Sequence, residues 1–254
     1  MIALLCGALV GLILGLVGGG GSILAVPLMV YVVGVKDPHV AIGTSALAVA
    51  VNALTGLYHH ARAGSVVWRC GVAFAAAGVA GAALGSTLGK EVDGQRLLLL
   101  FALLMLVVGG LMFRHRRMVG DENVVCARER LPKVLGYGGL TGMFAGFFGI
   151  GGGFLVVPGL VRSTGMTMLN AVGTSLVAVA AFGFTTAANY ALNGLVDWRL
   201  SGLFIVGGVA GGQLGAVLAR RLASQRGALS TLFAGAIFVV AFYMIWRSVG
   251  ALHL

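Results

Sequence analysis

Two glycine-rich stretches of the chain share one pattern. Residues 15–27 read GLVGGGGSILAVP, and residues 146–158 read GFFGIGGGFLVVP. A shift of 131 positions places four glycines, a leucine and a proline of the first stretch on the same residue types in the second. Clustered glycines break a helix and let other groups approach the backbone closely. We therefore interpret the rest of the sequence around two equivalent helix breaks.

The match between the two halves extends well beyond the glycines. At a shift of 130, Gly43-Thr44-Ser45 coincides with Gly173-Thr174-Ser175, and Trp68-Arg69 coincides with Trp198-Arg199. Four further glycines coincide in the same register: Gly64 with Gly194, Gly78 with Gly208, Gly81 with Gly211, and Gly85 with Gly215. The sequence thus predicts two copies of one structural unit.

The composition is that of an integral membrane protein. Of the 254 residues, 59% are hydrophobic and 9% are charged, whereas ordinary globular proteins carry about 25% charged residues. The net charge of +10 comes from bases in short loops between apolar segments. That pattern is typical of membrane proteins and argues against a nucleic-acid partner. The three cysteines have no CxxC spacing, so the sequence predicts no metal site.

Ten apolar segments are visible, five on each side of a basic stretch. They cover approximately residues 2–17, 22–35, 40–61, 66–89, 95–113, 134–150, 154–161, 167–192, 197–219 and 228–247. We predict an all-α integral membrane protein with three parts. Residues 1–113 form a first membrane repeat, residues 114–133 a cytoplasmic basic linker, and residues 134–254 a second membrane repeat.

The first two segments of each half are short for membrane spans, which need about 20 residues. We predict that each pair forms a V, in which the chain enters the membrane, breaks at the glycines and leaves on the side it came from. Two full crossings with a broken middle are the alternative. Either arrangement gives each half an odd number of crossings, so the two halves are predicted to be inverted repeats.

The carboxylates narrow the range of substrates. All seven lie in loops or at segment edges: Asp37, Glu91, Asp93, Asp121, Glu122, Glu129 and Asp197. The sequence therefore offers neither a proton relay of membrane carboxylates nor a cation site built from them.

The glycine breaks are the first candidate site. Helices beginning near Ser22 and Gly153 would direct free N–H groups and positive dipole ends into the breaks, where an anion can bind without a basic side chain. The alternative is that the glycines serve helix packing alone. The predicted substrate-binding residues here are Gly18, Gly19, Gly20, Gly21, Ser22, Gly149, Gly151, Gly152 and Gly153.

Polar residues of the third segments are the second candidate group. Thr and Ser hydroxyls can donate to an oxyanion, or they can bond to their own helix backbone. A buried Asn can contact a ligand, or it can tie two helices together. The residues concerned are Thr44, Ser45, Asn52, Thr174, Ser175 and Asn189.

Two further patterns have simpler readings. His59 and His60 could carry a proton between pH 5 and 8, but the second half has Asn189-Tyr190 at these positions, so such a role would be confined to the first half. Two GxxxGxxxG rows indicate close helix packing; they are Gly81, Gly85 and Gly89 in the first half and Gly207, Gly211 and Gly215 in the second.

The duplicated glycine stretch, its following proline and the later Gly-Thr-Ser resemble the sulfite exporter family named for TauE/SafE, also called the TSUP anion permeases. The resemblance covers residues 15 to about 220. It implies transport of sulfite or organosulfonates, with residues 18–22 and 149–153 lining the path. The first copy has Ser22 where the second has Gly153, so the two half-sites would differ.

We therefore expect a multi-pass secondary transporter of a bacterial inner membrane, which carries a small oxyanion by alternating access. The expected partners are the oxyanion and membrane lipid, and a homo-oligomer remains open. No GxxxxGK[ST] motif occurs, so no nucleotide cofactor is expected, and no HExxH motif indicates an enzyme. The alternatives are a transporter of another small anion and a membrane assembly protein that transports nothing.

The distribution of bases predicts the topology. With residues 114–133 in the cytoplasm, the inverted arrangement has 12 bases inside and 5 outside, whereas two parallel halves of four crossings each have 10 inside and 7 outside. The positive-inside rule favours the inverted arrangement, with both termini outside. Labelling of cysteines introduced into the loops will test this. Termini labelled from opposite faces would contradict it.

Overall fold

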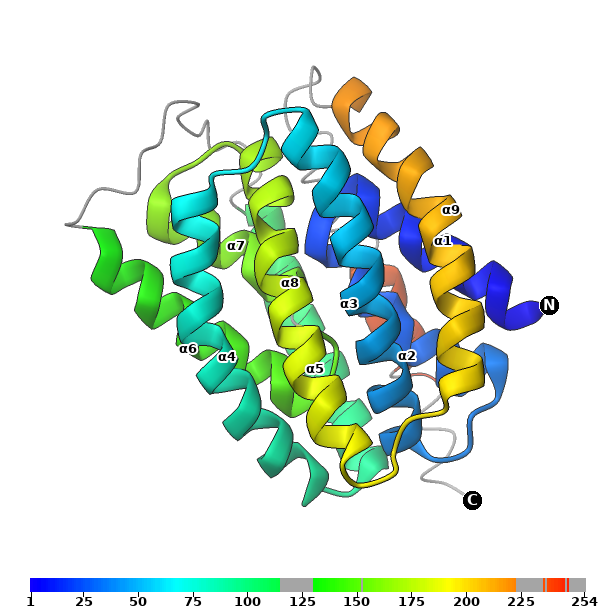
Figure 1. The fold of residues 1–254 in the computed structure, drawn as a ribbon. Helices are drawn as coiled ribbons and strands as arrows, with labels where there is room; N and C mark the ends of the chain where they lie inside the picture. Colours follow the sequence, from blue (N-terminus) through cyan, green and yellow to red (C-terminus); the bar gives the residue numbers. More distant parts are fainter. Residues whose placement is uncertain (115–129, 152, 223–234, 236, 245, 247–254) are drawn as a thin grey trace.

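A computed structural model describes residues 1–114, 130–151, 153–222, 235, 237–244 and 246, without the side chains of residues 17–20, 111–114 and 219–222. These residues form helices joined by short loops (Figure 1). The all-α class predicted from the sequence is therefore confirmed. Most of the predicted basic linker and part of the last predicted segment lie outside the described residues.

The helices follow the predicted segments closely. In the first half they are α1 (Ile2–Val17), the 3₁₀ helix η1 (Gly18–Leu24), α2 (Ala25–Leu28), the π-helical turn η2 (Met29–Val33), α3 (Pro38–Arg62), α4 (Trp68–Lys90) and α5 (Gly94–Arg114). In the second half they are α6 (Leu131–Phe148), α7 (Gly153–Thr164), α8 (Met168–Ala191) and α9 (Trp198–Leu222).

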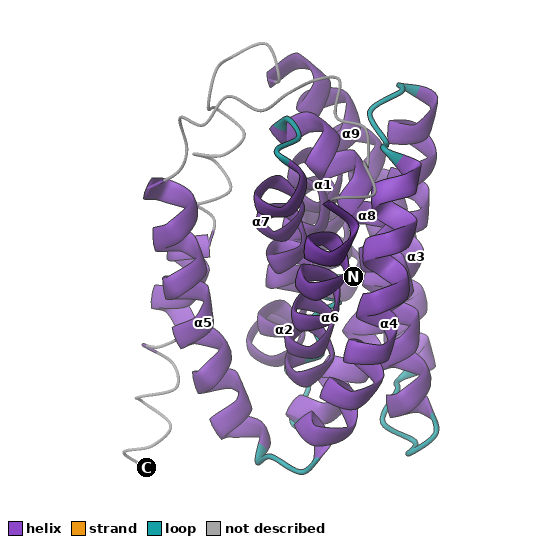
Figure 2. Cartoon of the chain, turned by 90° about the vertical axis from the view of Figure 1, so that its left-hand side faces the viewer, coloured by secondary structure: helices purple, strands orange, loops and turns teal. Residues whose placement is uncertain are grey.

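Four long helices form one layer of the molecule. Among the described residues, α3, α4, α8 and α9 are long and apolar enough to cross a membrane. In Figure 1 they lie in front, with α3 beside α8, α4 beside α8 and α9 beside α3, and each of these pairs is in contact. Behind them lie α1, α2, α6 and α7, and Figure 2 shows α5 on the far side of this second layer.

Helices of one half pack closely against helices of the other half, and glycines form these contacts. The most extensive contacts are those of α1 with α9 and of α4 with α6, so the first helix of each half packs along the fourth helix of the other. A Cβ atom at Gly7, Gly11 or Gly15 would overlap the carbonyl oxygen of Phe204, Gly208 or Gly212 respectively. The glycines of α6 meet α4 in the same way, at Phe74, Gly78 and Ala82.

The two GxxxGxxxG rows lie at helix–helix contacts, as predicted. Side chains at Gly81, Gly85 and Gly89 would overlap the backbone of α6, and side chains at Gly207, Gly211 and Gly215 would overlap that of α1. Each contact therefore presents glycines from both helices, and the backbones lie against each other along several turns. Close approach of this kind is what stabilises helix pairs in lipid, where the hydrophobic effect does not drive association.

In the second half, the short helix α7 ends near the start of α6. The Arg130 guanidinium, just before α6, donates to the carbonyl oxygen of Thr164, the last residue of α7. With 12 residues, α7 is about 18 Å long, well short of the roughly 30 Å hydrocarbon core of a bilayer. This arrangement is compatible with the V-shaped pair predicted for the second half; the V predicted for the first half stays a prediction.

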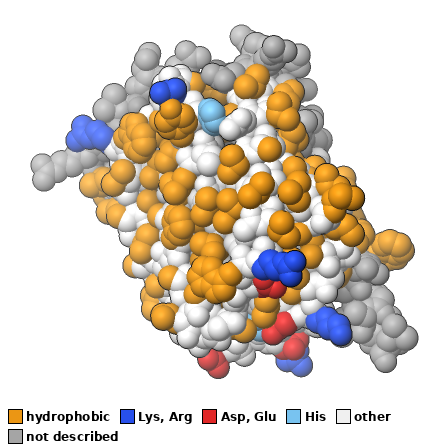
Figure 3. Space-filling view, turned by 45° about the vertical axis from the view of Figure 1, so that its right-hand side comes forward, with side chains coloured by type: hydrophobic (Ala, Val, Ile, Leu, Met, Phe, Trp, Pro, Cys, Tyr) orange, Lys and Arg blue, Asp and Glu red, His pale blue; other side chains and the backbone are white. Residues whose placement is uncertain are grey.

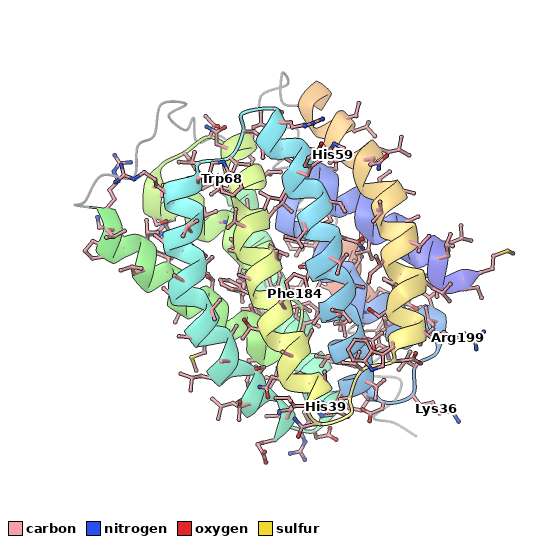
Figure 4. All side chains as sticks on the ribbon, viewed as in Figure 1. Lys36, His39, His59, Trp68, Phe184 and Arg199 are labelled. Atoms are coloured by element: carbon pink, nitrogen blue, oxygen red, sulfur yellow. The ribbon has the colours of Figure 1, made fainter. Side chains whose placement is uncertain are left out.

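The two ends of the helix layer differ in charge. Figure 4 shows His59 and Trp68 at one end, here called the His59 end, and Lys36, His39 and Arg199 at the other, here called the His39 end. All four described carboxylates lie at the His39 end, together with Lys36, Lys90, Arg96 and Arg199. The described bases of the His59 end have no carboxylate among them: Arg62, Arg69, Arg130, Lys133 and Arg162.

The surface between these ends is apolar. Figure 3 shows hydrophobic side chains across the middle of one face, with acids and bases near its lower edge and further bases near its upper left. The exposed side chains include Leu84 on α4 and Val206 and Leu214 on α9. An apolar band between charged ends fits a protein surrounded by lipid.

Equivalent helices of the two halves run in opposite directions. In Figure 1, α3 runs from the His39 end to the His59 end, whereas α8 runs the other way. The hydrogen bond from the Asp197 N–H, just after α8, to the Thr44 hydroxyl near the start of α3 agrees with this. How these directions relate to the two faces of a membrane stays a prediction.

The glycine contacts predict a sharp contrast between two alanine substitutions in α6. A Cβ at Gly142 would overlap the carbonyl oxygen of Gly78, whereas a Cβ at Gly136 has nothing within 4 Å. Gly142→Ala should therefore cost about 1–3 kcal/mol of stability through overpacking, and Gly136→Ala should not destabilise the protein. Thermal unfolding of both variants in detergent measures this, and equal midpoints would contradict the close packing of α4 and α6.

Candidate substrate-binding site

The two glycine breaks meet near the crossing of α3 and α8. The 3₁₀ helix η1 contacts α7, and both η1 and α7 contact α8. A Cβ atom at Gly151 would lie 3.3 Å from Cγ1 of Val49 on α3 and 3.9 Å from the Cα of Gly183 on α8. At the crossing itself, a Cβ on Gly183 would lie 2.9 Å from the Cβ of Ala50. The structure thus brings the two predicted half-sites together.

The two breaks differ in local structure. The second break agrees with the prediction, because α7 begins at Gly153. The prediction of a helix beginning near Ser22 is wrong: residues 18–24 continue from α1 as a 3₁₀ helix, and the next α-helix begins at Ala25. A continuous 3₁₀ helix uses most of its N–H groups internally, so the first break offers fewer free donors than a helix N-terminus.

The glycines of the two breaks have different structural roles. Side chains at Gly21 and Gly149 would overlap Leu14 and Ile42 respectively, so these two glycines are required for packing. Gly151 has a φ of +63°, which favours glycine, and a Cβ there would make a tight contact with Cγ1 of Val49 at 3.3 Å without overlapping backbone. Gly18, Gly19 and Gly20 form the first turn of η1. Gly152 lies outside the described residues.

The threonines of the Gly-Thr-Ser motifs join the two halves. The hydroxyl oxygen of Thr44 accepts from the Asp197 N–H at 2.9 Å, directly before α9. The hydroxyl oxygen of Thr174 accepts from the Val67 N–H at 2.9 Å, directly before α4. Each threonine thus satisfies an N–H at the start of the other half's fourth helix, where helices leave donors unpaired.

The neighbouring glycine and serine complete this contact. A Cβ at Gly43 would overlap the carbonyl oxygen of Leu195, and one at Gly173 would lie 2.6 Å from that of Ser65, so both glycines let a loop of the other half approach. The Ser45 and Ser175 hydroxyls donate to the carbonyl oxygens of Ile42 and Val172, three residues earlier. The backbone-bonding alternative therefore describes these two serines.

The two asparagines lie in different surroundings. Asn52 is in the middle of α3 with its amide against the backbone of Gly208, and within the described structure neither polar atom of that amide has a hydrogen-bond partner. Asn189 lies at the His39 end, where its Oδ1 accepts from the Lys90 Nζ at 2.9 Å and its Nδ2 donates to the Ser86 hydroxyl. Asn189 thus ties α8 to α4, away from the glycine breaks.

The buried polar side chains are neutral hydroxyls and amides, with one histidine. Among the described residues no Asp, Glu, Lys or Arg is buried. The buried polar set is Ser22, Thr44, Ser45, Asn52, His60, Ser65, Ser86, Thr141, Ser163, Thr164, Thr174, Ser175, Thr186 and Ser201. A site in this interior can therefore use hydrogen bonds and backbone dipoles, and among the described residues His60 is the one buried basic side chain.

Several buried polar groups were not predicted as site residues. Ser65 bonds to His60, while the hydroxyls of Thr186 and Ser201, and that of the buried Tyr190, have no hydrogen-bond partner among the described residues. The signal that could have found Ser65 is a difference between the repeats, since the position 130 residues later is Leu195. Thr186 and Ser201 likewise stand where the first half has Gly56 and Gly71.

Removing the hydroxyl of Thr44 or Thr174, while keeping the shape of the side chain, should lower the stability of the protein. Thr44→Val keeps the shape but leaves the Asp197 N–H without its acceptor, which should cost about 1–3 kcal/mol; Thr44→Ser keeps the acceptor and should cost less. Thr174→Val and Thr174→Ser form the matching pair in the second half. Thermal unfolding in detergent separates the cases, and valine variants as stable as the serine variants would exclude this role.

The chain matches known membrane proteins over nearly its whole length. Residues 3–244 match the family model described as sulfite exporter TauE/SafE. A Xylella fastidiosa protein named "Probable membrane transporter protein" is 53% identical over 243 residues, covering 95% of this chain and 93% of the relative. Bacillus subtilis YdhB, with a similar name, is 26% identical over 85% of this chain and 89% of its own length. No solved structure matches significantly. The chain belongs to the sulfite exporter TauE/SafE family.

Proposed function

We propose that this protein is a secondary transporter, in a bacterial inner membrane, for a small oxyanion such as sulfite or an organosulfonate. Membership of the TauE/SafE family and the transporter names of its relatives support the general class. The observation that carries the substrate class is the meeting of two glycine breaks at the α3–α8 crossing, in an interior whose described polar groups carry no carboxylate.

The anion is held by partial charges. The N-terminus of α7 at Gly153 supplies unpaired N–H groups and the equivalent of roughly +0.5 elementary charge. Gly151 lets an oxygen atom approach the backbone, because no side chain stands there. The Asn52 amide, buried and without a partner, is a further donor on the first half. Such a site favours anions and excludes cations, and hydroxyl and amide donors suit sulfur oxyanions.

Alternating access cannot move one sequence half as a rigid body against the other. The glycine contacts fasten α1 to α9 and α6 to α4 across the halves, and the threonine bonds fasten α3 to α9 and α8 to α4. The bodies that move are therefore α1, α3 and α9 against α4, α6 and α8, with the α3–α8 crossing between them. Small residues line that crossing: Ala46, Ala50 and Gly183.

Two other functions have less support. An intramembrane hydrolase needs a nucleophile with a base, or a metal site, and no group of three metal-ligating side chains lies among the described residues. An assembly protein without transport would use the glycines for structure alone; this fits Gly21 and Gly149, whose Cβ atoms would overlap neighbouring residues, and the positive φ of Gly151 is compatible with it.

The proposal predicts which solutes cross the membrane. Purified protein in liposomes should exchange radiolabelled sulfite or methanesulfonate, and should not carry potassium, ammonium or a neutral sugar, because partial positive charges and hydrogen-bond donors line the site. Flux assays with each solute measure this. Cation flux without any response to an oxyanion would overturn the proposed function.

The same assay locates the site through paired substitutions. Gly20→Val and Gly151→Val should abolish exchange by blocking approach to the backbone, and Ser22→Ala should weaken it less. Because a φ of +63° would also strain valine, Gly151→Asn is the sharper test, since Asn adopts that conformation more readily. Gly194→Asn, with a φ of +70° and nothing within 4 Å, is the matched control. Exchange retained by Gly151→Asn would remove the glycine break from the path.

A further inference from the structure

His60 is a buried ionisable side chain beside the first glycine break. It lies near the end of α3 with 2% of its surface exposed. Its Nδ1 is 2.9 Å from the Ser65 hydroxyl oxygen, and its Nε2 is 3.4 Å from the carbonyl oxygen of Gly15. Gly15 belongs to the last turn of α1, three residues before Gly18. The imidazole thus connects α3 to the point at which the first break begins.

Ser65 allows this histidine to bind a proton without losing either hydrogen bond. In the neutral form, Nε2–H donates to the Gly15 carbonyl and Nδ1 accepts from the Ser65 hydroxyl. In the charged form, Nδ1–H donates to the same hydroxyl oxygen, and the hydroxyl proton turns to the His60 carbonyl oxygen, which lies 3.1 Å away. Serine suits this role because its hydroxyl both donates and accepts.

The second half has lost both members of the pair. At a shift of 130, His60 coincides with Tyr190 and Ser65 coincides with Leu195. A phenol does not take up a proton near neutral pH, and a leucine cannot exchange donor and acceptor roles. The backbone framework is kept, because the Ser65 and Leu195 N–H groups both donate to the residue five positions earlier. At these two positions the backbone hydrogen bond is the same in both halves, and the proton-binding side chains are present in the first half alone.

From this geometry we infer that His60, with Ser65, binds the proton whose movement drives anion transport. A proton from water adds to Nδ1, and the resulting imidazolium lies beside the first glycine break, where its charge favours an anion. Release of the anion removes that stabilisation, and the proton leaves. One proton therefore accompanies one anion. The inference rests on the proposed function and adds the coupling ion to it.

The charged groups around His60 strengthen this coupling. The described side chains of α1 and η1 contribute no acid or base other than Cys6, and those of α5, α8 and α9 carry Arg96, Tyr190 and Arg199 near the His39 end. On α3 itself, the Arg62 guanidinium lies 4.6 Å from the centre of the Tyr58 ring. The remaining described groups of this end are His59, Arg69, Arg130, Lys133 and Arg162. None of these described groups is a carboxylate. In this proposal the transported anion compensates the charge of the imidazolium.

Transport driven by a pH difference tests the inference. Methanesulfonate is the probe, because it keeps a charge of −1 throughout the pH range in which histidine titrates. Wild-type protein in liposomes should accumulate it on the alkaline side, about tenfold for each unit of pH difference, since one proton moves with each anion. A protonophore should abolish the accumulation.

Three variants separate coupling from folding. His60→Gln keeps a side-chain donor but cannot bind a proton, so accumulation should fall to a ratio near one while exchange at equal pH continues. Ser65→Ala removes the acceptor of the charged form, so its accumulation should require a lower pH. Tyr190→Phe, at the equivalent position of the second half, should accumulate as the wild type does.

The outcomes distinguish this inference from the proposed function. Tenfold accumulation by His60→Gln would overturn the role of His60, as would an unchanged pH profile in Ser65→Ala. Wild-type exchange that ignores the pH difference would overturn proton coupling altogether while leaving the transport proposal in place. If the wild type exchanges no oxyanion at equal pH, the proposed function fails, and the inference fails with it.

Discussion

Backbone contact between helices is the constraint on which the rest of this structure depends. Along α1 and α9, and again along α4 and α6, glycines bring the main chains so close that an added methyl group would overlap a carbonyl oxygen. Such contacts leave no freedom of register, because each glycine must face one particular turn of its partner. The α3–α8 crossing, the glycine breaks and the threonine contacts are all positioned by these two fixed helix pairs.

Much of the architecture could be predicted because its signals are local or repeated. Apolar runs predicted most of the described helices to within a few residues, but not the 3₁₀ and π-helical turns between residues 18 and 33. The shortness of α7 indicated a V-shaped pair, since length limits what can cross a bilayer. The two-copy pattern was visible because equivalent helix contacts in the two halves require the same residue, as at Gly78 and Gly208. Which helix packs on which could not be predicted, since a glycine row specifies a close neighbour without identifying it.

The polar residues were harder to interpret for a physical reason. A hydroxyl both donates and accepts, so the sequence could not show that Thr44 and Thr174 accept backbone N–H groups of the other half. For Asn189 the sequence left open a contact with substrate or a bond between two helices, and its bonds to Lys90 and Ser86 fit the second. Ser65 was missed because an isolated serine carries no pattern; only its replacement by Leu195 in the other copy marks it.

The packing of helices of one half against helices of the other half has a consequence for how such a chain can evolve. A half-length ancestor would expose the glycine faces of its first and fourth helices, each shaped for a backbone that the same chain does not supply. Two copies would satisfy both faces, so that ancestor would be an obligate homodimer. Because the equivalent helices run in opposite directions, the two subunits would have to lie antiparallel. Gene fusion then frees each half to diverge, and the His60 and Tyr190 positions illustrate such divergence.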